Sequence, residues 1–291
     1  MNASGNALEF KNVTFVYGEN TTFRKVALDG VSVEFPAGSC TGLIGKTGSG
    51  KSTLAMLANG LLKPTSGEIT LFGNDLWEKP KKMREVRGKV GLVFQYPEYQ
   101  LFAETVEADI AFGPKNLGLD ENEIKTRVKL AADYCGVSEK ELARSPFELS
   151  GGQKRRVAIA GILAMKPQVL VLDEPAAGLD PKGREEILGG LEQFRKDYGT
   201  TVILISHSME DIARFADRLV VLHEGKVFIK GGLGEVFSRA EELFDAGLDV
   251  PQITKLFIEL KKRGLCKKTD VYTVRYAKNA ALKILAGDED V

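Results

Sequence analysis

Hydrophobic and polar residues alternate along the first part of the chain, in the way that half-buried strands require. The runs Leu8–Tyr17 and Val31–Phe35 alternate and are separated by polar and glycine-containing turns. Alternation with a period of two places one set of side chains on each face of a sheet. The pattern predicts an antiparallel β-region at this end of the chain.

Beyond residue 40 the chain changes to short buried runs separated by segments of helical spacing. The runs Thr41–Ile44, Val169–Leu172 and Thr201–Ile205 are typical of fully buried strands. Helical spacing covers Ser52–Leu62 and Lys182–Tyr198, and another helix with two short strands follows the third run. Strands and helices in this order predict an α/β domain with a mainly parallel sheet.

Helical periodicity alone fills the long segment before the second of these runs. Between residues 104 and 164, apolar residues recur three and four positions apart, at Val106, Ile110, Val128, Leu130, Ala132 and Leu142. We expect a helical subdomain, over about residues 96–164, inserted into the α/β domain.

The C-terminal part, residues 236–291, is rich in Lys and Glu and has helical stretches near Val250–Arg263 and Asn279–Leu285. We expect it to form a helical extension of a main domain that covers residues 1–235. The charged stretch Lys255–Lys262 fits an exposed helix or an interface helix, and a solvated tail remains an alternative.

Composition narrows the class of protein further. The 40 basic and 40 acidic residues cancel, which argues against nucleic acid as the main partner. The cysteines Cys40, Cys135 and Cys266 are odd in number and far apart, so a disulfide framework is not expected and a reducing compartment fits. Neither a leader-like start at Met1–Phe10 nor a membrane-spanning apolar run is evident.

The segment Gly45–Ser52 fits the phosphate-loop pattern G-x-x-x-x-G-K-[ST]. In that pattern, backbone N–H groups face the phosphates, Lys51 neutralises their charge, and Ser52 ligates Mg²⁺. At Lys46 we expect only the backbone to touch phosphate. A chance glycine-rich turn is the alternative, and the position between a predicted strand and a predicted helix disfavours it. The predicted ATP-binding residues here are Gly45, Lys46, Thr47, Gly48, Ser49, Gly50, Lys51, Ser52 and Thr53.

Two carboxylates follow the apolar strand Val169–Leu172. This placement delivers Asp173 to the Mg²⁺ shell and Glu174 to the water that attacks the γ-phosphate. Taken alone, a strand followed by two carboxylates would fit a solvated acidic turn equally well. The phosphate loop elsewhere in the chain favours the catalytic interpretation.

A second anion site is predicted at Leu149–Gln153, which reads Leu-Ser-Gly-Gly-Gln before a helix. Ser150, Gly151, Gly152 and Gln153 then lie at a helix N-terminus, where N–H groups attract phosphate. A chain with one phosphate loop has no use for a second phosphate site unless that site serves the nucleotide of another molecule.

With these motifs in place, residues 8–235 resemble the ABC ATPase family, whose signature is the sequence LSGGQ. The resemblance implies a P-loop NTPase fold of ABC ATPase type, with a mixed sheet, an antiparallel β-subdomain and the inserted helical subdomain. It also implies two composite ATP sites in a head-to-tail dimer, where the signature of one subunit closes over the ATP of the other.

The resemblance assigns roles to further residues. Tyr17 looks like the aromatic that stacks on adenine, although a core or cross-strand role is an alternative. Gln95 resembles the glutamine that contacts Mg²⁺ and the attacking water. His207 resembles the switch histidine at the γ-phosphate, where a surface cap residue is the alternative. The loop Ala177–Asp180 resembles the one that links the two active sites.

The aromatic stretch from Phe94 to Gly118 narrows the resemblance to the ATPases of energy-coupling-factor transporters, importers of vitamins and of metal ions such as cobalt and nickel. The insertion Gly18–Lys25 and the helix end Asn59–Pro64 resemble the second ATPase type of that group. That type implies a heterodimer with a related ATPase, and a homodimer remains open. Lys46 and Ala176 depart from the group, which often has His and Thr there, but neither change removes a catalytic group.

By the same resemblance, the groove near Gln95–Phe102 receives coupling helices of a membrane-embedded T component, which carries substrate-binding S components. Glu98 and Glu104 are candidate partners for basic groups of that subunit. The expected location is the cytoplasmic face of the cell membrane, with ATP and Mg²⁺ as cofactors.

Three other functions fit parts of the pattern. An exporter ATPase made as a separate chain shares the same core. A soluble ABC protein that acts on nucleic acid or ribosomes is weakened by the neutral charge and the single ATPase domain. A regulatory nucleotide-binding module without turnover is the third.

Overall fold

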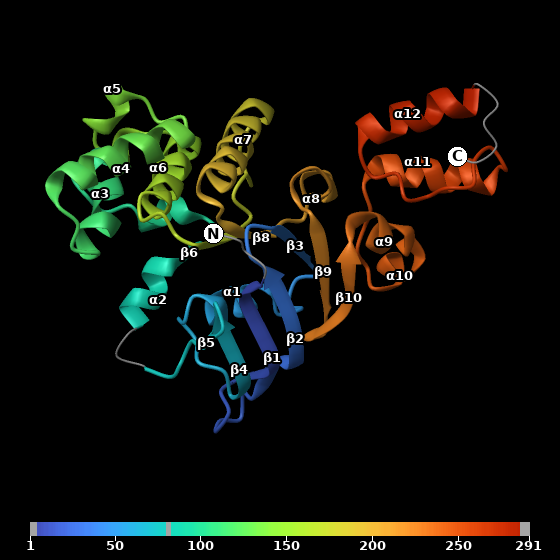
Figure 1. Ribbon diagram of the computed structural model, residues 1–291, viewed down its shortest axis with the longest axis horizontal. Helices are drawn as coiled ribbons and strands as arrows, with labels where there is room; N and C mark the ends of the chain where they lie inside the picture. Colours follow the sequence, from blue (N-terminus) through green and yellow to red (C-terminus); the bar gives the residue numbers. More distant parts are fainter. Residues whose placement is uncertain (1–4, 80–82, 286–291) are drawn as a thin grey trace.

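The computed structural model describes residues 5–79 and 83–285. Residues 1–4, within the segment considered for a leader, and residues 286–291 of the expected extension lie outside this described part. Two sheets form the centre of the molecule, a helical subdomain lies on one side, and the C-terminal helices lie on the other (Figure 1).

The smaller sheet is antiparallel, as the alternating pattern predicted. Its strand order is β2-β1-β4-β5, with β1 at Asn6–Tyr17, β2 at Lys25–Pro36, β4 at Ser66–Leu71 and β5 at Asn74–Asp75. β2 is longer than the predicted run, because Gly30 adopts a φ of 63° and lets the strand continue.

The larger sheet has the order β10-β9-β3-β8-β7-β6, which confirms the predicted mixed α/β fold. Its strands pair in parallel except for the antiparallel pair of β9 and β10. Parallel strands end at one edge, and ligand sites form at that edge. The bounds are β3 Cys40–Ile44, β6 Val90–Val93, β7 Val169–Asp173, β8 Thr201–Ile205, β9 Arg218–His223 and β10 Lys226–Gly232.

Helices cover both faces of the larger sheet. A buried cluster that includes Phe35, Leu57 and Val171 joins the smaller sheet and α1 (Lys51–Ala58) to one face. A second cluster, which includes Leu172 and Phe194, joins the other face to the helices beyond it. The remaining helices of this domain are α2 at Met83–Lys89, α7 at Pro181–Tyr198 and α8 at Met209–Phe215.

The helix after the phosphate loop ends earlier than predicted. It stops at Ala58, four residues before the predicted end at Leu62. The Asn59 side chain donates a hydrogen bond to the Val90 carbonyl, and Gly60 follows with a φ of 71°. A long-range contact and a left-handed glycine therefore terminate the helix.

The helical subdomain consists of η2 Pro97–Gln100, α3 Val106–Asn116, α4 Glu121–Tyr134, α5 Glu139–Leu142, η3 Pro146–Glu148 and α6 Gly151–Leu163. Helices α3, α4 and α6 pack on one another. On α4 the buried face carries Val128, Ala131 and Ala132, whereas Leu130 is 36% exposed. The interpretation of Leu130 as part of the apolar face was therefore wrong, because a residue two positions from Val128 lies on another face.

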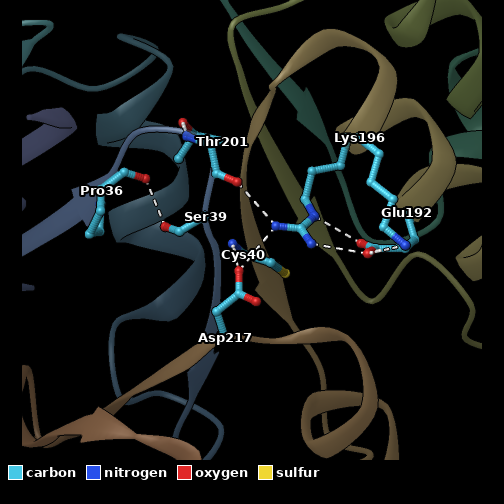
Figure 2. A network of polar contacts seen from close by, with 9 residues as sticks. Pro36, Ser39, Cys40, Glu192, Lys196, Thr201 and Asp217 are labelled. Carbon is cyan, nitrogen blue, oxygen red and sulfur yellow. Dashed lines mark hydrogen bonds and ion pairs between the residues drawn. The ribbon is translucent and has the colours of Figure 1, made fainter. Parts of the chain in front are cut away.

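A polar network holds the edge of the larger sheet that lies opposite the phosphate loop (Figure 2). The Arg195 guanidinium of α7 donates to both carboxylate oxygens of Glu192, to the Gly38 carbonyl and to Asp217. Asp217 also accepts from the Cys40 backbone N–H at 2.7 Å. The starts of β3 and β9 are thus tied to one helix, which fixes the strands whose other ends carry the site.

In the described part of the chain, four helices follow β10: α9 Leu233–Ser238, α10 Ala240–Asp245, α11 Gln252–Lys262 and α12 Val274–Leu285. Leu233, Phe237 and Leu243 of the first two join the main core. Helices α11 and α12 share a separate small cluster that contains Phe257 and Ala277. The helices α9 and α10 were not predicted.

The three cysteines are buried and free. Burial raises the pKa of the Cys40 thiol to about 12 and raises the pKa values of Cys135 and Cys266 as well. Within residues 5–79 and 83–285, no helix is long and apolar enough to cross a membrane.

Candidate functional site

The phosphate loop leaves β3 at Ile44 and enters α1 at Lys51. A Cβ at Gly45 would collide with the Leu222 carbonyl of β9, so only glycine fits there. The Lys51 ammonium donates to the Gly45 carbonyl at 2.6 Å and to the Lys46 carbonyl at 3.0 Å. Burial lowers the pKa of Lys51, and Asp173 and Glu174 act against that change.

A hydroxyl and a carboxylate face each other at the start of α1. The Ser52 hydroxyl donates to Asp173 Oδ2 at 3.0 Å, and Asp173 is 9% exposed at the end of β7. Burial raises the pKa of Asp173, while the Ser52 hydrogen bond and the Lys51 charge lower it. These two oxygen donors fit Mg²⁺, a hard cation that takes carboxylate and hydroxyl ligands.

Glu174 and His207 meet where β7 and β8 end. The His207 backbone N–H donates to Glu174 Oε1 at 2.6 Å, and the ring Nε2 lies 3.9 Å from the same oxygen. Glu174 has a φ of 53°, a strained conformation for a non-glycine residue, and strain of this kind is common at functional sites. Burial raises the pKa of the Glu174 carboxyl, and the nearby His207 acts against it.

A cavity of about 320 Å³ brings these groups together. Tyr17 forms part of its wall, and its hydroxyl lies 3.3 Å from Thr53 Oγ1. Gly45, Lys46 and Ser49 do not line the cavity, although they belong to the predicted loop. The predicted residues that line it are Tyr17, Thr47, Gly48, Gly50, Lys51, Ser52, Thr53, Gln95, Asp173, Glu174 and His207.

Two lining residues, Lys25 and Ala27, were not predicted. Lys25 begins β2 and pairs directly with Tyr17 across the hairpin, so the insertion returns the chain to the same wall. Its ammonium adds a positive charge to a cavity that holds a phosphate loop. The hairpin register was the signal that could have located it.

The signature segment is organised as predicted but stands apart from this cavity. The Ser150 hydroxyl accepts from the Gln153 N–H at 3.4 Å, and Gln153 Oε1 accepts from the Ser150 N–H at 2.9 Å. This reciprocal capping box starts α6. Residues 149–153 are not among those that line the cavity. Within one chain, the predicted ATP-binding residues therefore fall into two separate sets.

The aromatic stretch forms an exposed patch, here called the aromatic patch, made of Tyr96, Tyr99, Phe102 and Phe112. Tyr99 is 85% exposed and Phe102 is 60% exposed, and the Phe102 and Phe112 rings meet edge to face at 4.8 Å. Phe102 and Phe112 also line a cavity of about 680 Å³ between α2, α3 and α6. An exposed apolar surface of this kind is a candidate docking surface for another protein.

The two acidic candidates near the aromatic patch differ. Glu104 is exposed. Glu98 is turned inward, with its side chain 16% exposed and both carboxylate oxygens bonded to Arg155. Of the two, Glu104 is the one available to an outside basic group.

Comparison with known proteins identifies the family of the chain. Residues 28–177 match the ABC transporter family model. The chain is 53% identical over 279 residues to the energy-coupling factor transporter ATP-binding protein EcfA2 of Clostridium tetani, covering 96% of this chain and 97% of that protein. It is 52% identical to the protein of the same name from Caldanaerobacter subterraneus subsp. tengcongensis, covering 98% and 99%.

Solved structures show the same relationship. The structure of cbiO1 from Clostridium perfringens, described as part of the ABC transporter complex cbiONQ, matches with a TM-score of 0.73 and 37% identity over 87% of this chain and 99% of that chain. An ATP-binding cassette solved as a dimer with ADP and Pi matches with a TM-score of 0.71 and 29% identity over 78% and 98%. The predicted resemblance is confirmed: this chain belongs to the ABC transporter family, among the energy-coupling factor transporter ATP-binding proteins.

Proposed function

We propose that the cavity between Tyr17 and His207 binds ATP with Mg²⁺ and that Glu174 drives its hydrolysis. The chain is an ATPase subunit of a transporter by family, and we assign ATP binding, Mg²⁺ binding and hydrolysis to named residues. The arrangement that carries the proposal is the meeting of Lys51, Asp173, Glu174 and His207 at one edge of the parallel sheet.

Each residue has a task that its geometry supports. Tyr17 forms the wall on which adenine stacks, and the phosphate loop with Lys51 holds the phosphates. Glu174 orients the attacking water and accepts its proton, and the nearby His207 contacts the γ-phosphate. Ser52, Asp173 and Gln95 would hold Mg²⁺. When bound, Mg²⁺ neutralises charge that develops on the transferred phosphoryl group.

The separate signature suggests a head-to-tail dimer with a second ABC ATPase. Ser150, Gly151, Gly152 and Gln153 stand at the N-terminus of α6 and are available to the nucleotide of a partner. The resemblance to the second ATPase type implies a related but different chain as that partner, and a homodimer is the alternative. The main domain would cover residues 1–235, with residues 236–291 as an extension that contributes to pairing.

The aromatic patch and the cavity beside it form the proposed docking surface for a membrane-embedded T component, which associates with substrate-binding S components. This placement puts the chain at the cytoplasmic face of the cell membrane. The likeness to cbiO1, described as part of the ABC transporter complex cbiONQ, supports a place in a transporter complex. An importer of vitamins or transition-metal ions is proposed from the resemblance to the energy-coupling-factor group.

Phosphate release tests the hydrolase assignment. The wild-type chain with its ATPase partner should release phosphate from Mg·ATP, and Glu174→Gln should lose at least about 100-fold in rate, because the water is no longer activated. Glu224→Gln is a matched control, since Glu224 has a similar φ of 48° but does not line the cavity. Absence of turnover in the wild type would leave a regulatory nucleotide-binding module.

Recovery from detergent-solubilised membranes tests the transport assignment. The chain should copurify with a second ATPase and a multi-span subunit, and the cargo of that complex separates an importer from an exporter. ATPase activity that responds to nucleic acid and ignores every membrane subunit would contradict the assignment.

A further inference from the structure

Arg155 is a buried charge that connects three segments of the chain. It lies on α6, five residues after Ser150 of the signature, and is 3% exposed. Its Nε and Nη2 donate to Glu98 at 3.1 and 3.2 Å, as a two-pronged ion pair. Its Nη1 donates to the Ala177 carbonyl. Its guanidinium also lies 5.8 Å from the centre of the Tyr96 ring.

Each of the three segments belongs to a different part of the proposed machinery. Glu98 lies on η2, which packs on α6 and presents Tyr99 of the aromatic patch to solvent. Ala177 begins the loop Ala177–Asp180, which follows Glu174 by three residues. The helix α6 itself begins with the signature. One side chain therefore joins the docking surface, the signature and the loop beside the catalytic carboxylate.

A second contact reinforces the same connection. A Cβ at Gly152 of the signature would lie 3.1 Å from Leu179 Cδ2, so the loop packs closely on the first turn of α6. Tyr96 has a φ of 62°, a conformation that a tyrosine adopts only when its surroundings hold it. Arg155 contacts the ring of Tyr96 itself and binds Glu98 two residues later, so both contacts hold that strained turn.

The chemistry of arginine makes this connection rigid. A planar guanidinium matches a carboxylate with two parallel bonds, and lysine cannot reproduce that geometry. A buried charge that loses its partner costs free energy, so separation of the Glu98 and Arg155 side chains is strongly disfavoured. Displacement of η2 must then move α6 and the 177–180 loop with it.

We infer that Arg155 is a positioning residue that makes η2, the signature helix and the 177–180 loop move as one unit. A partner that presses on the aromatic patch thereby repositions the signature, which serves the neighbouring nucleotide, together with the loop that follows Glu174. This inference rests on the proposed docking and dimer pairing. The nucleotide cavity of the same chain does not contain Arg155 or Glu98, so ATP binding there does not depend on them.

Three variants in the full transporter complex test the inference: Glu98→Gln, Arg155→Lys and the two combined. The binding of a fluorescent ATP analogue to the isolated chain should change less than about twofold. In the complex, kcat for ATP should fall about tenfold or more with KM nearly unchanged, because misplacement by an ångström is costly in rate. The double variant should be no slower than the slower single variant, because both break one connection.

Glu186→Gln is the matched control. Glu186 lies on α7, and its carboxylate pairs at 3.0 Å with Arg156, the residue after Arg155 on α6. The control therefore removes an ion pair of the same helix that does not involve η2. This control should change kcat less than about twofold, as expected of an exposed pair.

Several results would overturn the inference. These are an additive double variant, a Glu186→Gln loss equal to that of Glu98→Gln, or weaker ATP-analogue binding that tracks the loss of turnover. If all three variants have wild-type kinetics and the membrane subunit stimulates the wild-type ATPase, the inference about Arg155 is refuted and the proposed docking stands. Absence of that stimulation in the wild type would instead refute the proposed docking.

Discussion

The Lys46 side chain of the phosphate loop lies directly over Gly247, the second residue after α10. A Cβ at Gly247 would collide with Lys46 Cε and Nζ, and Gly247 itself has a φ of 65°. The phosphate loop and the C-terminal helices are therefore in contact, although they are far apart in the sequence. Lys46 was expected to contribute its backbone alone, and its side chain makes this separate contact.

This contact predicts that Gly247→Ala displaces the Lys46 side chain without weakening ATP binding. The added methyl group meets only the flexible end of that side chain, which can swing away while the phosphate loop stays in place, and Lys46 does not line the nucleotide cavity. Equilibrium binding of ATP should change less than about twofold in Gly247→Ala and in the double variant Lys46→Ala/Gly247→Ala.

Gly199→Ala separates the collision from backbone strain. Gly199 also follows a helix, has a φ of 63°, and has no atom within 4 Å of the position that an added methyl group would take. Both substitutions carry the left-handed strain of about 1–2 kcal/mol, which thermal unfolding measures. The two variants should lose similar stability, and a loss of ATP affinity confined to Gly247→Ala would contradict the prediction.

Lys25 should contribute to ATP affinity. Lys25→Gln removes a positive charge from the wall of the cavity that holds the phosphate loop. We expect the Kd for ATP to rise about three- to tenfold, which corresponds to about 1 kcal/mol. The ratio of the variant Kd to the wild-type Kd should be larger at low ionic strength, where charges are screened less. Arg24→Gln is the control, because the Arg24 side chain lines a different cavity, beside Val26 and His223. A Lys25→Gln protein that binds like Arg24→Gln would contradict the prediction.

Tyr17 should act through its ring rather than its hydroxyl. Tyr17→Phe keeps the wall of the cavity and loses only the contact with Thr53, so ATP binding should remain close to wild type. Tyr17→Ala should weaken binding by about 1–3 kcal/mol, the usual value for stacking on a base. Phe23→Ala, in the neighbouring insertion Gly18–Lys25 and 86% exposed, controls for loss of an aromatic residue. Unchanged affinity in Tyr17→Ala would favour the alternative that Tyr17 is a structural cross-strand residue.

Glu174→Gln should stabilise the nucleotide-free protein at high pH. Burial raises the pKa of Glu174 above its ordinary value of 4.5, so the native state holds this proton more tightly than the unfolded state does. Stability of the wild type therefore falls as pH rises from 4.5 to the native pKa, whereas the variant lacks this loss. Thermal unfolding should give matching Tm values below about pH 4 and a higher Tm for the variant at about pH 8. A gap that is constant with pH would contradict this account.

Local sequence signals predicted the parts of the site that depend on local structure. The Ser150 cap and its Gln153 partner lie three residues apart, and strand β8 has the predicted bounds Thr201–Ile205. The phosphate loop follows from one contiguous motif between a strand and a helix. Such features depend on a few neighbouring residues, so the sequence alone was sufficient for them.

The remaining features depend on contacts between distant residues. The end of α1 depends on a hydrogen bond from Asn59 to Val90, and the place of Lys25 depends on the register opposite Tyr17. Glu98 was expected to face a partner, but Arg155, 57 residues away, binds it inside the chain. Helices α9 and α10 have six residues each, too few for a helical period to be visible.

The three buried thiols have a practical consequence for labelling. Maleimides and related probes react with exposed thiolates, and each native cysteine is both enclosed and held in its protonated form. A cysteine introduced at Tyr99, which is 85% exposed, would therefore be the one position that a dye or spin label modifies in the folded protein. A Tyr99→Cys chain can carry a single reporter on its aromatic patch without prior removal of any native cysteine.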